Sequence, residues 1–264
     1  MIAILDYGRG NLGSVEKAFG RVGMRAIVTD DPVVVDDAEA VVLPGDGAFH
    51  DAMANLERLG LLGPLARTLR DGRPFLGICL GYQLLFSTSE EFGQGRGLDV
   101  IPGAVVRFPA GRKIPHMGWN QVRHAGDMRL FAGIPDGAHF YFVHSYYPVV
   151  AGAASPAPAV GGLREKRGAA GRPISPAERP GAPERANTRG EKRGAAERPI
   201  SPAERRGAAG RAGLHAAWCD YGVRFAAAIE HAPIYATQFH PEKSQRWGLR
   251  LLENFAALVK DGLR

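Results

Sequence analysis

The sequence predicts an α/β fold: an open, mixed and mainly parallel sheet with helices on both faces, followed by a second half that is rich in strands. Three observations support this. Short, continuously apolar runs alternate with longer segments whose apolar residues recur at helical spacing. Glycine and proline separate these segments. After residue 103 the helical segments become rare. Strands that are apolar throughout are typical of a parallel sheet covered by helices on both faces.

The first half alternates the two kinds of element. Short apolar runs predict strands at 2–7, 25–30, 40–45 and 74–78. Apolar residues three and four positions apart predict helices at 11–23, 50–62, 64–72 and 80–87.

The second half changes character. Successive strands are expected at 103–108, 118–123, 139–149, 215–221 and 223–230. The run 234–239 predicts a return to the core of the main sheet, and an amphipathic helix with Ser244 as its N-cap is expected over 244–262.

Bulk composition indicates a globular protein of the cytoplasm. The chain has 264 residues, of which 45% are hydrophobic. Its apolar runs fall short of the roughly 20 residues that a membrane-spanning helix requires. The N-terminus lacks the basic segment of a signal peptide, so we expect none. Two cysteines argue against a disulfide framework and for a reducing compartment.

The net charge of +6 comes from a single segment. Residues 151–213 hold 13 basic and 6 acidic residues, whereas the rest holds 20 and 21. The segment has no aromatic residue and contains a repeat, because EKRGAAGRPISPAERPGA at 165–182 recurs with two changes at 191–208. We therefore expect one domain over 1–264, interrupted by a basic, mostly disordered insertion. Without aromatic residues for base stacking, the insertion could attract nucleic acid only through phosphate charge, and we expect no such role.

Cys79 stands between Gly77 and Gly81, where an apolar strand pattern gives way to a helical one. A sharp strand-to-helix turn holds a nucleophile at the edge of a sheet. The amides at the start of the helix favour a thiolate and, led by Leu80, can bind an oxyanion. A lone cysteine between glycines is weak evidence, because buried cysteines are also common in cores.

Two further segments are predicted to reach the same edge. His240 and Glu242 are two residues apart after a strand, so both side chains can face one way, and a carboxylate can then orient an imidazole base. The loop from Gly45 to Gly47 can offer a second oxyanion amide. Taken together with Cys79, these residues predict nucleophilic catalysis.

Other polar residues receive simpler interpretations. Cys219 has no flanking glycines and is expected to be structural. Asp46 would disfavour a nearby thiolate, so we give it no catalytic role. The remaining histidines lack metal-ligand spacing, and neither a metal nor another cofactor is expected; they are His50, His116, His124, His139, His215 and His231.

GICLGYQ with a downstream FHPEKS resembles the triad, or class I, glutamine amidotransferases, which have a flavodoxin-like core. DYGRGN (6–11), PHMGWN (115–120) and FVHSYY (142–147) narrow the resemblance to the glutaminase subunits of imidazole glycerol phosphate synthase. It covers 1–150 and 213–264. The insertion is the one clear departure from the family.

The resemblance implies that Cys79 attacks the side-chain amide of glutamine, that His240 transfers protons and that Glu242 orients His240. It also implies that ammonia passes to a barrel-shaped cyclase subunit in histidine biosynthesis. The residues that would hold the amino-acid end of glutamine are Gln83, His144, Ser145 and Tyr146. Those that would face the cyclase are Tyr7, Arg9, Asn11, Met117, Trp119, Asn120 and Lys243.

Two alternatives stay open at this point. The chain could be a triad glutaminase that serves anthranilate, aminodeoxychorismate or guanylate synthesis, although PHMGWN and DYGRGN argue against this. It could instead be a non-catalytic binding protein that uses the basic insertion, although the intact Cys79, His240 and Glu242 argue against that.

Overall fold

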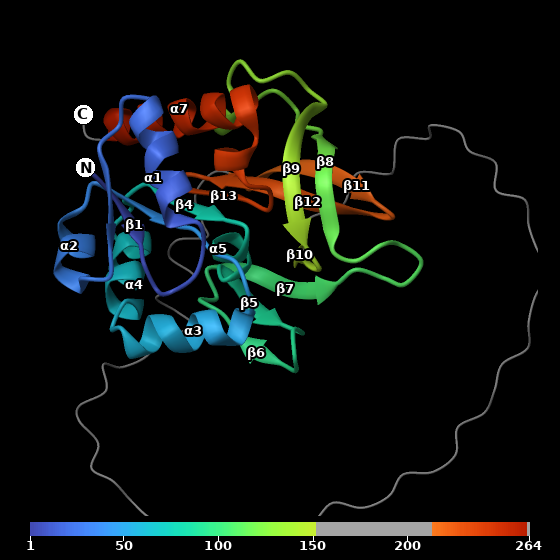
Figure 1. Cartoon of the computed structure of the whole chain (residues 1–264), viewed down its shortest axis with the longest axis horizontal. Coiled ribbons are helices and arrows are strands. Elements are labelled where there is room, and N and C mark those ends of the chain that lie inside the picture. The colour runs from blue at the N-terminus through green and yellow to red at the C-terminus, as the bar shows by residue number, and fades with distance from the viewer. Residues whose placement is uncertain (152–212, 263–264) are drawn as a thin grey trace, which may run out of the picture.

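The computed structural model describes residues 1–151 and 213–262 (Figure 1). The expected insertion lies outside these described residues except for its two end residues. Within the described chain, no helix is both long enough and apolar enough to cross a bilayer.

The main sheet has seven strands in the order β11-β12-β13-β4-β3-β1-β2. Five of them run parallel: β1 (Ile2–Leu5), β2 (Ala26–Thr29), β3 (Ala40–Leu43), β4 (Phe75–Ile78) and β13 (Ile234–Thr237). The antiparallel strands β12 (Val223–His231) and β11 (His215–Tyr221) extend one edge. The mixed, mainly parallel sheet predicted from the sequence is confirmed.

Helices cover both faces of this sheet (Figure 1). On one face α1 (Leu12–Arg21) and α7 (Gln245–Gly262) pack over a core cluster that includes Ile4 and Leu76. On the other face α2 (Pro32–Asp37), α3 (Phe49–Arg58) and α4 (Leu62–Arg70) pack over a second cluster that includes Leu5 and Phe75. Neighbouring residues of one strand thus enter opposite cores, as strand alternation requires, and this explains why the strands are apolar throughout.

Two smaller sheets make the second half rich in strands. One has the order β10-β7-β5-β6, formed by β10 (Tyr146–Val150), β7 (Ile101–Arg107), β5 (Phe86–Ser89) and β6 (Gly95–Arg96). The other is the hairpin of β8 (His116–Val122) and β9 (Ala138–His144). The described residues also form two 3-10 turns, η1 (Arg129–Phe131) and η2 (Pro241–Lys243).

Three local expectations were wrong. The helix predicted over 80–87 stops early: α5 covers only Leu80–Gln83, and the chain then enters β5, whose Phe86 pairs with Ile101. The strand predicted over 139–149 is interrupted at Ser145, because β9 and β10 belong to different sheets.

The third error concerns the start of α7. The Ser244 hydroxyl does not cap this helix, because it donates to the His240 carbonyl oxygen and accepts from the Tyr141 amide. Ser244 therefore ties η2, which follows His240, to strand β9.

Candidate active site

Cys79 occupies a strained turn between β4 and α5. Its backbone has φ +55°, a conformation that residues with a side chain rarely adopt. Glycine is required on both sides of it. A Cβ on Gly81 would lie 1.7 Å from the Leu43 carbonyl oxygen, and one on Gly77 would lie 2.8 Å from that of Gly81. The Cys79 amide donates to the Thr237 carbonyl oxygen at 2.7 Å, so β13 holds the turn from the neighbouring position in the sheet. The sharp strand-to-helix turn predicted at Cys79 is present.

His240 and Glu242 form a buried pair just beyond β13. His240 Nδ1 lies 2.8 Å from Glu242 Oε1, and both side chains are almost inaccessible to solvent. Because β13 and β4 are parallel neighbours, this pair and Cys79 follow adjacent carboxyl ends of the sheet. The structure therefore brings the three predicted catalytic residues together.

Electrostatics couples His240 to both neighbours. Burial alone lowers the pKa of His240, but the Cys79 thiolate and the hydrogen-bonded Glu242 carboxylate raise it more, from 6.5 to about 10. His240 Nε2 has no partner within ordinary hydrogen-bond geometry among the described residues, and the charge of Cys79 contributes more to the raised pKa than a hydrogen bond to its sulfur does. An imidazolium beside a thiolate is the charge state that a cysteine nucleophile needs.

Gln238 contacts the nucleophile and was missed in the sequence. It is fully buried, and its Nε2 lies 3.6 Å from Cys79 Sγ. Alternation along a strand does not explain its position, because residues 238–239 form a bend and Glu242 lies in the 3-10 turn η2. The extended chain expected through His240 and Glu242 was therefore wrong, although the two side chains do meet.

The expected oxyanion site is closed in this structure. The Leu80 amide donates to the Gly45 carbonyl oxygen at 3.4 Å, so the donor expected to stabilise an oxyanion is engaged by the loop expected to help it. The loop is tightly fitted here. Tyr7 donates to the Pro44 carbonyl oxygen at 2.8 Å, and a Cβ on Gly45 would lie 2.0 Å from the Tyr7 hydroxyl. Gly47 has φ +88° and packs against Arg9.

The residues expected to hold glutamine lie together beside Cys79. Gln83 Nε2 donates to the Tyr146 carbonyl oxygen at 3.0 Å and to Gln238 Oε1 at 3.1 Å. His144 Nδ1 lies 2.8 Å from the same Tyr146 carbonyl oxygen. Ser145 is the residue at which the chain passes from β9 to β10.

The residues expected to face a partner divide into three groups by their exposure. Met117 and Trp119 are large apolar side chains with exposed fractions of 60% and 47%. Arg9, Asn11, Asn120 and Lys243 are at least partly exposed. Tyr7 is completely buried, so its predicted place at an interface was wrong. Its ring is needed inside the molecule to support the Pro44–Gly45 loop.

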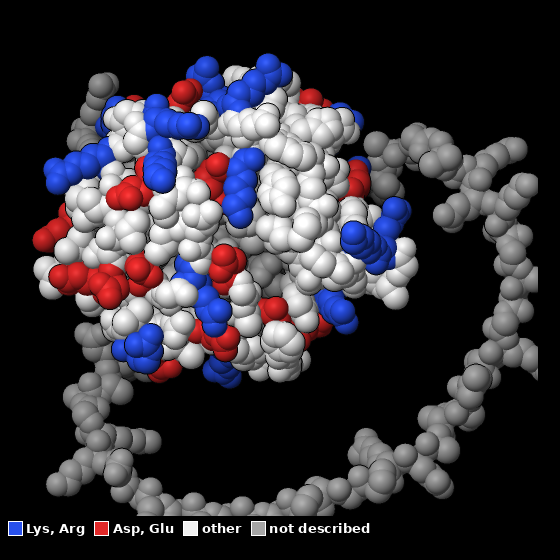
Figure 2. All heavy atoms as spheres, in the orientation of Figure 1, with Lys and Arg blue, Asp and Glu red and all other residues white. Residues whose placement is uncertain are grey.

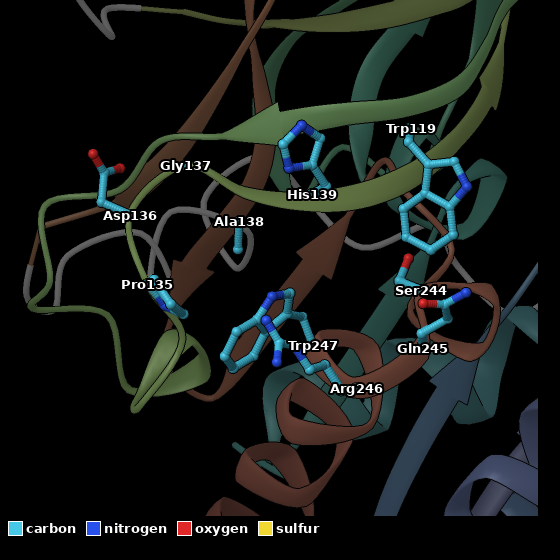
Figure 3. A pocket seen from close by; sticks show the side chains of 10 residues that line it. All are labelled: Trp119, Pro135, Asp136, Gly137, Ala138, His139, Ser244, Gln245, Arg246 and Trp247. Carbon is cyan, nitrogen blue, oxygen red and sulfur yellow. The ribbon is translucent and has the colours of Figure 1, made fainter.

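An open cleft of about 780 Å³ lies between the β8–β9 hairpin and the start of α7 (Figure 3). Trp119, His139 and Trp247 are among its lining residues, and Arg246 stacks over the Trp247 ring at 4.3 Å. None of the three catalytic candidates lines it. The cleft is therefore separate from the buried turn at Cys79.

Surface charge and the clustering of possible metal ligands bear on two other kinds of site, one for nucleic acid and one for a metal ion. On the face shown in Figure 2, basic and acidic side chains are interspersed over the described body. Within the described ranges no three His, Cys, Asp or Glu side chains gather in the manner of metal ligands.

Solved structures show the same fold at low sequence identity. A crystal structure of a glutamine amidotransferase aligns with a TM-score of 0.60 and 15% identity, covering 98% of each chain. The structure of PurLQS from Thermotoga maritima aligns with a TM-score of 0.59 and 14% identity, covering 100% of this chain and 98% of the other.

Sequence comparison is more specific. The family model for class-I glutamine amidotransferases matches residues 3–156. Proteins named imidazole glycerol phosphate synthase subunit HisH match almost from end to end. The protein of Moorella thermoacetica is 44% identical over 98% of this chain and 95% of its own length. The protein of Desulfitobacterium hafniense (strain DSM 10664 / DCB-2) is 42% identical over 99% of this chain and 96% of its own length. That of Geobacter sulfurreducens is 44% identical over 97% and 98%. With its nucleophile turn and buried histidine–glutamate pair, the chain belongs to the class-I glutamine amidotransferases and, within them, to the HisH family.

Proposed function

We propose that this chain is the glutaminase subunit of an imidazole glycerol phosphate synthase, which hydrolyses glutamine at Cys79 and delivers ammonia to a cyclase subunit. The observation that carries the chemistry is the meeting of the strained Cys79 turn with the buried His240–Glu242 pair. The full-length similarity to HisH proteins supports the pathway. The 151–213 insertion is proposed to take no part in hydrolysis.

The proposed reaction is a two-stage acyl transfer. The Cys79 thiolate attacks the side-chain amide carbon of glutamine, and His240 gives its proton to the departing nitrogen, which leaves as ammonia. Water then loses a proton to His240 and attacks the glutamyl thioester. Glutamate leaves, and the proton on His240 restores the resting pair. Glu242 holds the ring through Nδ1, so that Nε2 faces the reaction throughout.

Oxyanion stabilisation requires a change from the resting geometry. The Leu80 amide must exchange the Gly45 carbonyl oxygen for the oxyanion, which requires reorientation of the peptide between Gly45 and Asp46. The resting chain should therefore hydrolyse glutamine slowly. One oxyanion donor is worth about 10²–10³ in rate, so a partner that frees this amide should accelerate hydrolysis by a similar factor.

The surface proposed for the cyclase lies near the catalytic pair. Trp119 contacts Tyr141 edge-on, with ring centroids 6.1 Å apart. The Tyr141 carbonyl oxygen in turn accepts from the His240 amide. Lys243 follows Glu242 directly and is exposed. Exposed tryptophan and methionine on one strand suit an interface anchor, because aromatic residues and Met are enriched at the centres of interfaces.

The test is glutamate release from glutamine by the purified chain, alone and with the cyclase and its ribonucleotide ligand. We expect slow release alone and a stimulation of roughly 10²-fold or more with both additions. Fast hydrolysis that ignores the cyclase would overturn the proposed pathway. Absence of hydrolysis under both conditions would overturn the proposed chemistry.

A further inference from the structure

Two buried histidines outside the triad are joined to each other. His116 Nδ1 on β8 lies 3.0 Å from His144 Nε2 on β9. The other nitrogen of each ring is also engaged: His144 Nδ1 lies 2.8 Å from the Tyr146 carbonyl oxygen, and His116 Nε2 lies 3.1 Å from Asn120 Nδ2. The proposed reaction uses neither ring as an acid or base, so this arrangement needs another explanation.

The partners determine where the protons are. A carbonyl oxygen only accepts, so His144 must carry its proton on Nδ1, and a neutral ring then leaves Nε2 as an acceptor. His116 must therefore donate from Nδ1, and its bare Nε2 accepts from the Asn120 amide. Asn120 directs its second proton to the Asp220 carbonyl oxygen at 3.2 Å. Within the chain of bonds, donation runs in one direction, from Asn120 through His116 and His144 to Tyr146.

The surroundings keep both rings neutral and immobile. His116 is stacked between Tyr221 and Phe142, with ring centroids 4.0 and 4.8 Å away. Burial lowers the pKa of His116 to about 4, and burial lowers that of His144 to about 3. At neutral pH each ring therefore has one donor and one acceptor, as the chain of bonds requires.

The chain of bonds ends at the nucleophile. The Tyr146 carbonyl oxygen accepts from both His144 and Gln83, and Gln83 also donates to Gln238. Gln238 in turn contacts Cys79 Sγ. These bonds hold Ser145–Tyr146, where the backbone passes from β9 in one sheet to β10 in another.

We propose that His116 is a positioning residue for glutamine, because it orients His144 and thereby fixes the Ser145–Tyr146 backbone beside Cys79. This proposal rests on the proposed function and deepens it, since it makes substrate binding depend on a residue that never touches substrate. Strand alternation supports the assignment: His116 and Asn120 face inwards on β8, whereas Met117 and Trp119 face outwards.

A pair of amide substitutions tests the proposal. In His116→Asn the amide nitrogen takes the place of Nδ1 and can still donate to His144. In His116→Gln the amide reaches the place of Nε2, which keeps an acceptor for Asn120 but leaves His144 Nε2 without its donor. In His116→Gln the buried His144 Nε2 loses its hydrogen-bond donor, which carries an energetic cost. We expect this cost to raise KM for glutamine by roughly tenfold and to change kcat much less. His116→Asn should stay within about threefold of wild type for the same reason.

The control is His139→Asn, an exposed histidine on the same hairpin, which should leave both constants unchanged. Equal KM values for wild type and His116→Gln would overturn the proposal. So would a loss in His116→Asn as large as that in His116→Gln, since the amide donor would then restore nothing.

A spectroscopic measurement on the unmodified protein tests the proposal even if the His116 variants fail to fold. Nitrogen-15 spectra of the imidazoles should show His116 and His144 both neutral and both protonated on Nδ1. An Nε2 proton or an imidazolium at either position would overturn the proposal. Cys79→Ala, assayed in parallel, separates the two hypotheses. Continued hydrolysis by that variant would defeat the proposed function, whereas an inactive Cys79→Ala with an unaltered His116→Gln would defeat the positioning role alone.

Discussion

Cys79 and Cys219 are both buried, with exposed fractions of 6% and 1%, but their surroundings have little in common. Cys219 lies inside β11, paired with Phe225 of β12 just after a register shift between Ala217 and Trp218. Burial, with the nearby Asp220 charge, raises the pKa of its thiol, so it remains neutral. Cys79 sits in a left-handed turn with an imidazole base, a carboxylate and a buried amide around it.

Under the proposed function, burial does not decide whether a cysteine reacts. Strand β11 places Cys219 in a core, where burial disfavours the thiolate. The turn at Cys79 breaks the strand pattern, points the sulfur at the edge of the sheet and brings it to the His240–Glu242 pair. Backbone conformation and polar neighbours, and not accessibility, distinguish the two thiols.

The largest expected effect comes from removing each sulfur in turn. Cys79→Ala should lower kcat for glutamine hydrolysis by at least ~10³-fold, because a nucleophile deletion in a triad enzyme removes the covalent route. Cys219→Ala should keep kcat within a few-fold and lose only packing stability. Steady-state assays of both variants under cyclase stimulation measure this contrast. Comparable losses in the two variants would contradict it.

The next largest effect comes from Glu242, the carboxylate paired with His240 beside Cys79. Cys219 has no comparable histidine–carboxylate pair beside it among the described residues. Glu242→Gln should retain the fold but lower kcat by roughly 10²–10⁴-fold, since the amide no longer holds His240 in the required tautomer or stabilises its charge. The measurement is kcat with saturating glutamine, with circular dichroism to verify folding. A folded variant with near-normal kcat would remove Glu242 from the mechanism.

The glycines near each cysteine give a smaller, structural effect. Gly81→Ala forces a Cβ against the Leu43 carbonyl oxygen and should cost about 3 kcal/mol of unfolding free energy, together with most of the activity. Gly222→Ala, near Cys219, meets only the flexible Arg112 side chain at a positive φ. It should cost about 1–2 kcal/mol and leave activity intact. Denaturant titration and activity assays of Gly81→Ala and Gly222→Ala measure these effects. Equal stability and equal activity in the two variants would contradict the requirement for glycine in the Cys79 turn.

The smallest effect is a pH dependence. The folded-state pKa of His240 lies above its ordinary 6.5, so the folded chain retains a proton that the unfolded chain releases as pH rises. The thiolate that helps to raise this pKa has itself given up a proton, which the unfolded thiol keeps up to about pH 8.5. The two effects offset each other between pH 6.5 and about 8.5, so the unfolding free energy should be nearly flat there and fall only above pH 8.5, by at most about 1.4 kcal/mol per pH unit. Cys219→Ala should leave this profile unchanged, whereas Cys79→Ala removes the offsetting thiol and should change it, and denaturation at several pH values measures both.

The sequence predicted what short-range patterns control. Buried strands, amphipathic helices and the glycine-flanked turn are local signals, and the structure contains most of those predicted. His240 and Glu242 do meet, but through the 3-10 turn η2 and not along the extended chain that was expected. The helix expected over 80–87 failed because Phe86 pairs with Ile101, a partner in a different sheet. Local spacing cannot show such a competing pairing. The α2 helix was missed although Asp31 and Pro32 form a typical start signal.

The remaining site features depend on contacts between distant segments. Tyr7 is buried because the Pro44–Gly45 loop closes over it. The Leu80 amide is engaged because Gly45 turns its carbonyl oxygen towards it. The link between His116 and His144 arises from hairpin register, which pairs these two positions across 28 residues. None of these contacts has a signature within a window of sequence, so they emerge only with the fold.

The most direct test of the difference between the two cysteines is covalent labelling with a glutamine analogue that carries a diazoketone in place of the side-chain amide. Peptide mass mapping then locates the adduct. We predict an adduct on Cys79 that glutamine competes away, together with an unmodified Cys219 in the same molecules. Labelling of Cys219, or label in Cys79→Ala at the wild-type level, would contradict the assignment of Cys79 as the nucleophile.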